Sequence, residues 1–223
     1  MKLRQFAWGV GLDYAWAFST RAGYLRESRP PEQLVQGTRR PVLMIPGVYE
    51  PWRYLLTIGS RLHSLGHPVH VLPDLGYNVN PIADTAATAQ RYLDELDLRD
   101  VAIVGHSKGG IVGKHMMAFD DLDHRITTLV AISSPFSGSG RAKYIPVRTL
   151  KPFLPGDPLL GSLAANLELN SRITSICTAV DQVIPESSRL EGATNIEIPI
   201  VGHFRLLSDP RVLDAVVAAI DPE

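Results

Sequence analysis

Short apolar segments alternate with longer amphipathic segments along most of this chain. The apolar segments are rich in valine and isoleucine, as expected of buried strands, and cover residues 42–45, 69–72, 101–104, 126–132, 173–180 and 196–200. Helical spacing predicts helices at residues 52–65, 84–96, 111–117 and 210–220, with Asp84 as an N-cap. This alternation predicts a single α/β domain over residues 1–223, with about six mostly parallel strands and helices on both faces.

Two segments fall outside the alternation. Residues 1–35 form an N-terminal extension in which Lys2 and Arg4 precede an apolar run that Asp13 interrupts. No small-residue cleavage site follows, so we expect an aromatic-rich helix over residues 1–28 that docks on the body, with a membrane-surface role as the alternative. Residues 133–171 form the second segment, and we expect a lid-like insertion over residues 136–165, since long loops in compact domains are often lids.

The strongest chemical signal is the sequence Gly-His-Ser-Lys-Gly-Gly at residues 105–110. It lies between an expected strand and an expected helix, which is the setting of the G-x-S-x-G nucleophile turn. Glycine permits the tight backbone of such a turn, which lifts the serine hydroxyl above the end of the sheet. Ser107 is therefore the candidate nucleophile.

A serine hydroxyl needs a base, and the base needs a partner that orients it. His203 follows the last expected strand and comes after the serine, so it is the candidate base. Asp181 directly follows the strand at 173–180 and is the candidate acid, with Glu186 as the rival. Asp157 is expected to cap a helix instead. Two backbone N–H groups must bind the oxyanion, and we expect Lys108 together with Val48 or, alternatively, Tyr49.

Together these motifs resemble those of the α/β-hydrolase superfamily, and within it those of small bacterial lipases and esterases. The resemblance extends from Pro41 to Ile220 and rests on residues 45–48, 105–110, 181–185 and 202–203. It implies hydrolysis of carboxylic esters, including triacylglycerols, through an acyl-enzyme and without a cofactor. Lys108 replaces the more usual Met, Gln or Leu. Its side chain is expected to point into solvent, with attraction of an anionic substrate group as the alternative.

The composition narrows the list of partners. The net charge is −1, which gives no electrostatic footprint for nucleic acid, and no spacing of His or Cys indicates a metal site. Cys177 is the one cysteine and is expected to be a small core residue. Without a convincing signal peptide or transmembrane segment, we expect a cytoplasmic protein. The same triad would also serve an acyltransferase or thioesterase, while its presence argues against a non-enzymatic scaffold.

The insertion is the expected source of substrate contacts. Residues 136–155 contain no acidic side chain; their basic residues are Arg141, Lys143, Arg148 and Lys151, and their apolar residues include Tyr144, Ile145, Val147 and Leu150. We expect Tyr49, Phe136, Phe153 and Leu154 to line an acyl groove and to favour medium-chain esters, since each buried CH₂ contributes about 0.8 kcal/mol. The basic residues are expected to face an anionic lipid surface.

Overall fold

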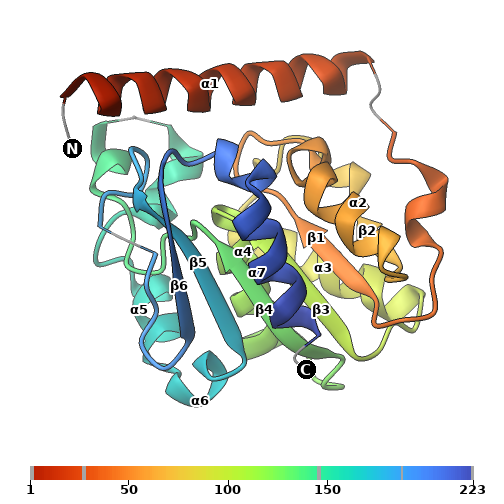
Figure 1. The fold of residues 1–223 in the computed structure, drawn as a ribbon. Helices are drawn as coiled ribbons and strands as arrows, with labels where there is room; N and C mark the ends of the chain where they lie inside the picture. Colours follow the sequence, from red (N-terminus) through yellow and green to blue (C-terminus); the bar gives the residue numbers. More distant parts are fainter. Residues whose placement is uncertain (1–2, 27–28, 145–146, 187, 222–223) are drawn as a thin grey trace.

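In the part of the chain that the structure describes, six strands form one parallel sheet in the order β2-β1-β3-β4-β5-β6 (Figure 1). This computed structural model describes residues 3–26, 29–144, 147–186 and 188–221. The strands are β1 (Val42–Ile45), β2 (Val69–Val71), β3 (Val101–His106), β4 (Ile126–Ile132), β5 (Ile173–Val180) and β6 (Thr194–Val201). The predicted fold class is confirmed. The main difference from the predicted strands is that β3 does not end at residue 104 but continues to His106, the residue before Ser107.

Helices cover both faces of the sheet (Figure 1). The α-helices are α1 (Leu3–Arg26), α2 (Leu56–Ser64), α3 (Ile82–Glu95), α4 (Lys108–His115), α5 (Pro158–Ala165), α6 (Leu167–Asn170) and α7 (Pro210–Ile220). Shorter turns are η1 (Glu32–Val35), η2 (Trp52–Leu55), η3 (Pro73–Leu75), η4 (Met116–Asp120), η5 (Gly140–Tyr144), η6 (Arg148–Phe153) and η7 (Arg205–Ser208). The N-cap prediction for Asp84 is wrong: α3 begins after Pro81, so Asp84 lies within its first turn.

The two faces of the sheet belong to two apolar layers. In β1, Val42 and Met44 pack toward α2 and α7, whereas Leu43 and Ile45 pack toward α3 and α4. This division follows from the pleat, which sends successive side chains to opposite faces. Because both of its faces are covered, the central strand β1 is apolar and buried throughout, whereas the edge strand β6 carries exposed polar residues. Cys177 is buried in β5, as expected of a core residue.

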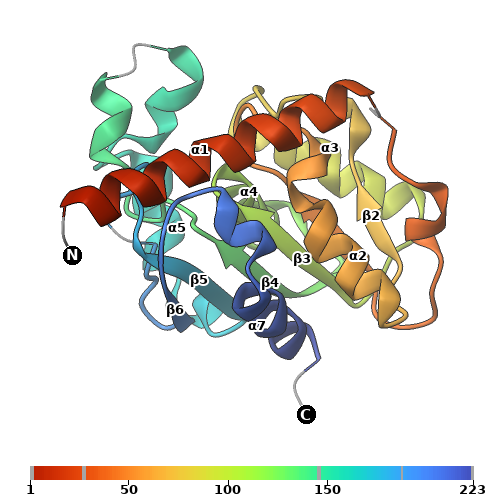
Figure 2. The same cartoon turned by 45° about the horizontal axis from the view of Figure 1, so that its top comes forward.

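The N-terminal extension forms a long helix that crosses the edge of the sheet where the strands end (Figure 2). Helix α1 packs against η2, β6 and η7, and the ring of Trp16 meets that of Tyr54 edge to face at 5.6 Å. The expected docked helix is therefore present, although Lys2 lies outside the described residues. No helix in the described ranges has both the length and the apolar character needed to span a membrane.

Candidate active site

Ser107 occupies a strained turn between β3 and α4. Its φ of 52° and ψ of −116° lie in a region that side chains other than glycine rarely adopt, and such strain is typical of functional positions. A Cβ atom on Gly109 would lie 1.9 Å from the carbonyl oxygen of Ile45, and one on Gly105 would lie 2.4 Å from the backbone of Gly109. Only glycine fits at these two positions, which explains the spacing of the motif.

The side chain of Lys108 is buried beside this turn. It is 2% exposed, and its Nζ donates to the backbone oxygen of Asn78 at 2.9 Å, to Oδ1 of Asn78 at 2.8 Å and to the backbone oxygen of Asn80. Burial lowers the pKa of Lys108 to about 8. The expectation that this side chain points into solvent is wrong, because the loop at 78–80 offers it a set of oxygen acceptors. Because the Lys108 ammonium group already donates to these oxygens, it is less able to attract an anionic group of a substrate, which was the alternative expectation.

Asn78 extends this contact to the loop after β1. Its Nδ2 donates to the backbone oxygen of Pro46 at 2.7 Å, and its Oδ1 also accepts the Thr85 hydroxyl at 3.2 Å. The Lys108 side chain therefore links the start of α4 to the segment that precedes Gly47. These are the two segments from which the sequence predicts oxyanion donors.

His203 and Asp181 lie together beyond the ends of β6 and β5. Asp181 Oδ2 accepts a hydrogen bond from His203 Nδ1 at 2.7 Å, and Asp181 Oδ1 accepts the N–H groups of Val183 and Ile184 at 2.7 and 2.8 Å. Burial acts to raise the pKa of Asp181, but the charge and hydrogen bond of His203 and the two backbone bonds outweigh it, so the pKa is lowered. Because Nδ1 faces Asp181, Nε2 is the ring nitrogen that can serve a nucleophile.

The other carboxylates considered from sequence have different partners. Glu186 Oε1 accepts the N–H of Gly140 at 2.7 Å and so holds the base of the insertion. Asp157 caps α5, as expected. Of these candidates, only Asp181 contacts His203.

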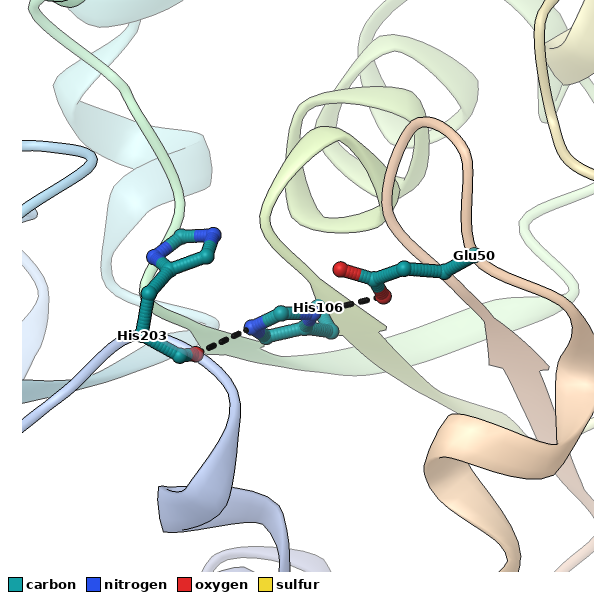
Figure 3. A group of neighbouring side chains, drawn as sticks. All are labelled: Glu50, His106 and His203. Atoms are coloured by element: carbon teal, nitrogen blue, oxygen red, sulfur yellow. Dashed lines mark hydrogen bonds and ion pairs between the residues drawn. The ribbon is translucent and has the colours of Figure 1, made fainter. Parts of the chain in front are cut away.

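His106 and Glu50 form a second buried pair, which lies beside His203 (Figure 3). His106 Nδ1 lies 2.7 Å from Glu50 Oε2, which also accepts the N–H of Gly47 at 2.8 Å. His106 Nε2 lies 2.9 Å from the backbone oxygen of His203 and must donate, since a carbonyl only accepts. The rings of His106 and His203 are 4.8 Å apart, which brings the candidate base next to the residue preceding Ser107.

Glu50, His106 and His203 also have ligand atoms within 4.8 Å of one another, as a metal site would require. Both ring nitrogens of His106 are already in hydrogen bonds, and Glu50 accepts the N–H of Gly47 as well. A cation would have to displace these bonds. The donor set therefore fits a hydrogen-bond network better than a coordination shell.

Ser107 opens into a cavity of about 70 Å³ whose lining is largely apolar. Its walls are Val48, Pro135, Ser139, Arg141, Ala142, Leu150, Phe153, Val183 and Ile184. Phe153 also borders a second cavity of about 520 Å³, lined by residues 79–82, Lys108, Thr149, Lys151 and Pro152. Phe153 thus lines both a small cavity at the serine and a much larger one.

The remaining residues predicted to contact substrate lie in different places. Phe136 is 3% exposed, packs in the core layer with residues of α4 and is not among the residues that line either cavity, so its contact with substrate stays a prediction. Tyr49 is partly exposed, and its hydroxyl lies 2.7 Å from Thr149 Oγ1 of the insertion. Leu154 is half-buried at the end of η6 and lines neither cavity, whereas Ile145 lies outside the described residues.

The sequence did not indicate three residues that lie near this site: Asp13, Glu50 and Asn78. Each is polar and buried, and each has at least one hydrogen-bond partner that lies 30 or more residues away in the chain. Asp13 was visible only as an interruption of an apolar helical run. Glu50 and Asn78 follow strand ends, which is a weak signal shared by many loop residues.

Comparisons with known proteins agree with this architecture. A model of the PGAP1-like alpha/beta domain family matches residues 82–143, which include the Ser107 turn. An extracellular α/β-hydrolase from a Paenibacillus species is 17% identical with a TM-score of 0.60, covering 83% of this chain and all of that one. The mature form of a Bacillus licheniformis lipase is 14% identical with a TM-score of 0.61, covering 86% and 94%. Lipase B of Aspergillus fumigatus is 16% identical with a TM-score of 0.63, covering 84% and 53%. At these identities the likeness is one of fold.

The close contact at Gly109 yields a test of the turn. Gly109→Ala places a methyl group against the Ile45 carbonyl, so we expect a loss of about 3 kcal/mol or more in the free energy of unfolding. Gly161→Ala in α5 is the matched control, since a Cβ there meets no atom within 4 Å, and it should stabilise by about 0.5–1 kcal/mol. Urea denaturation of both variants measures this difference. Equal stability of the two variants would mean that the turn does not press on β1.

Proposed function

We propose that this protein, which has the α/β-hydrolase fold, is a serine hydrolase that cleaves carboxylic esters through an acyl-enzyme. The observation that carries the proposal is the strained Ser107 turn beside the buried His203–Asp181 pair. Strain at a serine has a ready explanation if the turn must expose the hydroxyl to substrate. The buried pair supplies an oriented base of the kind that a serine nucleophile needs.

In the proposed reaction, Ser107 Oγ attacks the ester carbonyl carbon while His203 Nε2 takes the hydroxyl proton. Asp181 keeps the Nδ1 proton in place and stabilises the imidazolium that forms. The C–O bond to the alcohol then breaks, and the alcohol leaves with the proton from His203. A water molecule next gives a proton to His203 Nε2 and attacks the acyl-enzyme; the bond to Ser107 Oγ then breaks, His203 returns the proton to Oγ, and the carboxylic acid leaves.

The developing oxyanion needs two donors, and we assign them to the backbone N–H groups of Lys108 and Val48. Val48 lines the same cavity as Ser107, which favours it over Tyr49. The link from Lys108 through Asn78 to Pro46 supports this assignment, since it holds the two donor segments at a constant separation. Fixed donors stabilise charge without reorganising during the reaction.

We assign the acyl chain to the small cavity beside Ser107. The size of this cavity suits a short acyl chain. We therefore propose a preference for short-chain esters in place of the medium-chain esters expected from sequence. Residues 140–153 contain no acidic residue, and Arg141, Lys143 and Lys151 are exposed. We therefore retain contact with an anionic lipid surface as part of the proposal.

The same acyl-enzyme can pass its acyl group to an acceptor other than water, so acyl transfer is one alternative; product analysis distinguishes it, since hydrolysis releases a free carboxylic acid and transfer to an alcohol releases a new ester. Thioester cleavage is the other alternative: it forms the same acyl-enzyme but releases a thiol, and rates for an ester and a thioester with the same acyl chain distinguish it.

Ser107→Ala should abolish ester hydrolysis while the protein stays folded. Removing a triad serine lowers kcat by about 10⁶ in a well-studied protease, because only binding and the oxyanion site remain. Hydrolysis of p-nitrophenyl esters measures the loss, and a fluorophosphonate probe should label Ser107 in the unaltered protein. Turnover by Ser107→Ala at the original rate would end the proposal.

Asp181→Asn should lower kcat by several orders of magnitude, since the same change in a serine-protease triad costs about 10⁴. The asparagine oxygen can still accept from Val183 and Ile184, but its NH₂ group then faces His203 Nδ1 and favours the wrong tautomer. Glu186→Gln is the control, because its remaining oxygen can still accept the Gly140 N–H. Ester kinetics should rank the two variants in this order, and the reverse order would reassign the acid.

For the acyl chain, kcat/KM should rise from acetyl to butyryl esters by up to about fourfold per CH₂, following about 0.8 kcal/mol per buried CH₂. It should fall for longer chains as the small cavity fills. Phe153→Ala should join the two cavities and move the optimum to longer chains, while Leu154→Ala should leave it unchanged. A chain-length series of p-nitrophenyl esters tests this. An optimum that does not move in Phe153→Ala would remove Phe153 from the acyl site.

A further inference from the structure

Helix α1 contributes a buried carboxylate to the segments that carry His203 and Asp181. Asp13 is 0% exposed, and its Oδ2 accepts the backbone N–H of His203 at 2.9 Å and Nε2 of Gln182 at 2.6 Å. Its Oδ1 accepts the backbone N–H groups of Phe204 and Arg205 at 2.9 and 2.7 Å. All four partners are donors, so the group acts only as an acceptor. It satisfies the N–H groups at the start of η7 from a different element, as an N-cap side chain normally does locally.

The fit between α1 and the histidine turn is close. Gly202 has a φ of 137°, and a Cβ on it would lie 2.4 Å from Asp13 Oδ1. A Cβ on Gly9, one turn earlier in α1, would lie 2.8 Å from Cβ of Val201. Glycines at both positions let the helix approach the end of β6 closely enough for the Asp13 carboxylate to reach the turn.

The backbone of His203 is consequently held on both sides. Asp13 binds its N–H, while His106 donates to its carbonyl oxygen at 2.9 Å. The Gln182 side chain, which also binds Asp13, adjoins Asp181. One carboxylate therefore contacts both the segment of the base and the segment of the acid.

We propose that Asp13 is a positioning residue for the base: it holds the His203 turn in register with the Asp181 loop, so that the imidazole faces Ser107. This inference rests on the proposed ester hydrolysis and deepens it. It also assigns a function to the N-terminal helix, which lies outside the motifs that suggest the chemistry.

The charge of Asp13 affects the pKa of His203, so the pH dependence of kcat/KM tests the role of Asp13 separately from its effect on folding. Burial acts to lower the pKa of His203, but the charge and hydrogen bond of Asp181 and the charges of Glu50 and Asp13 outweigh it, so the pKa is raised above 6.5. Those three carboxylates, with the ring of His106, are the titratable groups around His203. Removing the Asp13 charge lowers the His203 pKa. The acid limb of kcat/KM, which reports the base in the free enzyme, must then move to lower pH.

Asp13→Asn is the decisive variant, because it keeps the shape, removes the charge and turns an NH₂ group toward two of the four donors. We expect kcat for p-nitrophenyl butyrate to fall at least tenfold with KM little changed, and the acid limb of kcat/KM to move to lower pH. Ala17→Gly is the matched control. Ala17 is buried one turn later on α1 and accepts the Tyr54 hydroxyl through its carbonyl, but has no contact with the His203 turn among its hydrogen bonds. This control should lower Tm and leave the acid limb in place.

The inference is overturned if Asp13→Asn keeps the original kcat and acid limb, or if it loses activity only in proportion to its Tm, as Ala17→Gly does. If Asp13→Asn does not fold, Gln182→Met decides: it removes one bond to Asp13 and keeps the charge, so kcat should fall at least threefold with the acid limb unmoved. An unchanged kcat in that variant would then overturn the inference. Failure of the proposed function looks different, since the unaltered protein would neither hydrolyse the ester nor react with the fluorophosphonate probe.

Discussion

The contact between the Ser107 turn and the end of β1 organises this site. Strands β1 and β3 are neighbours in the sheet, and Gly109 lies so close to the Ile45 carbonyl that no side chain fits between them. That contact sets where Ser107 stands relative to the loop after β1. The same loop brings Val48 to the serine cavity and Glu50 to His106. A larger residue in the turn would disturb the serine and the groups around it together, because tightly packed interiors transmit small displacements.

Three carboxylates are buried around a single histidine, which is costly unless each is hydrogen-bonded. Asp181 contacts the ring, Glu50 acts through His106, and Asp13 binds the backbone. Each of the three also accepts backbone N–H groups, which offsets the loss of water. The result is a histidine whose ring and main chain are both fixed and whose pKa is raised despite its burial. Such an arrangement suits a base that must keep one tautomer and one orientation.

The buried ammonium group of Lys108 is also held by hydrogen bonds close to Ser107. A buried charge without hydrogen-bond partners would be unfavourable beside the serine, and here Lys108 Nζ donates to oxygens of Asn78, Asn80 and Thr85. The position right after the serine therefore has two uses. Its backbone N–H is the proposed oxyanion donor, while its side chain holds the loop at 78–80 and, through Asn78, the segment before Gly47.

Local sequence was enough to predict the six strands, the tight turn at Ser107 and the pairing of Asp181 with His203. Strand periodicity and glycine spacing act over a few residues, and parallel strands deliver the residues that follow them to one edge of the sheet. Such short-range patterns could not predict the contacts of Asp13 and Glu50. They also could not predict the direction of the Lys108 side chain or the core position of Phe136. Asp13 is 190 residues from His203, and no local pattern encodes a partner so distant. Periodicity indicates which side of an element is buried, but only the packing of α1 across the sheet edge, and of the 78–80 loop over α4, decides which donors and acceptors meet there.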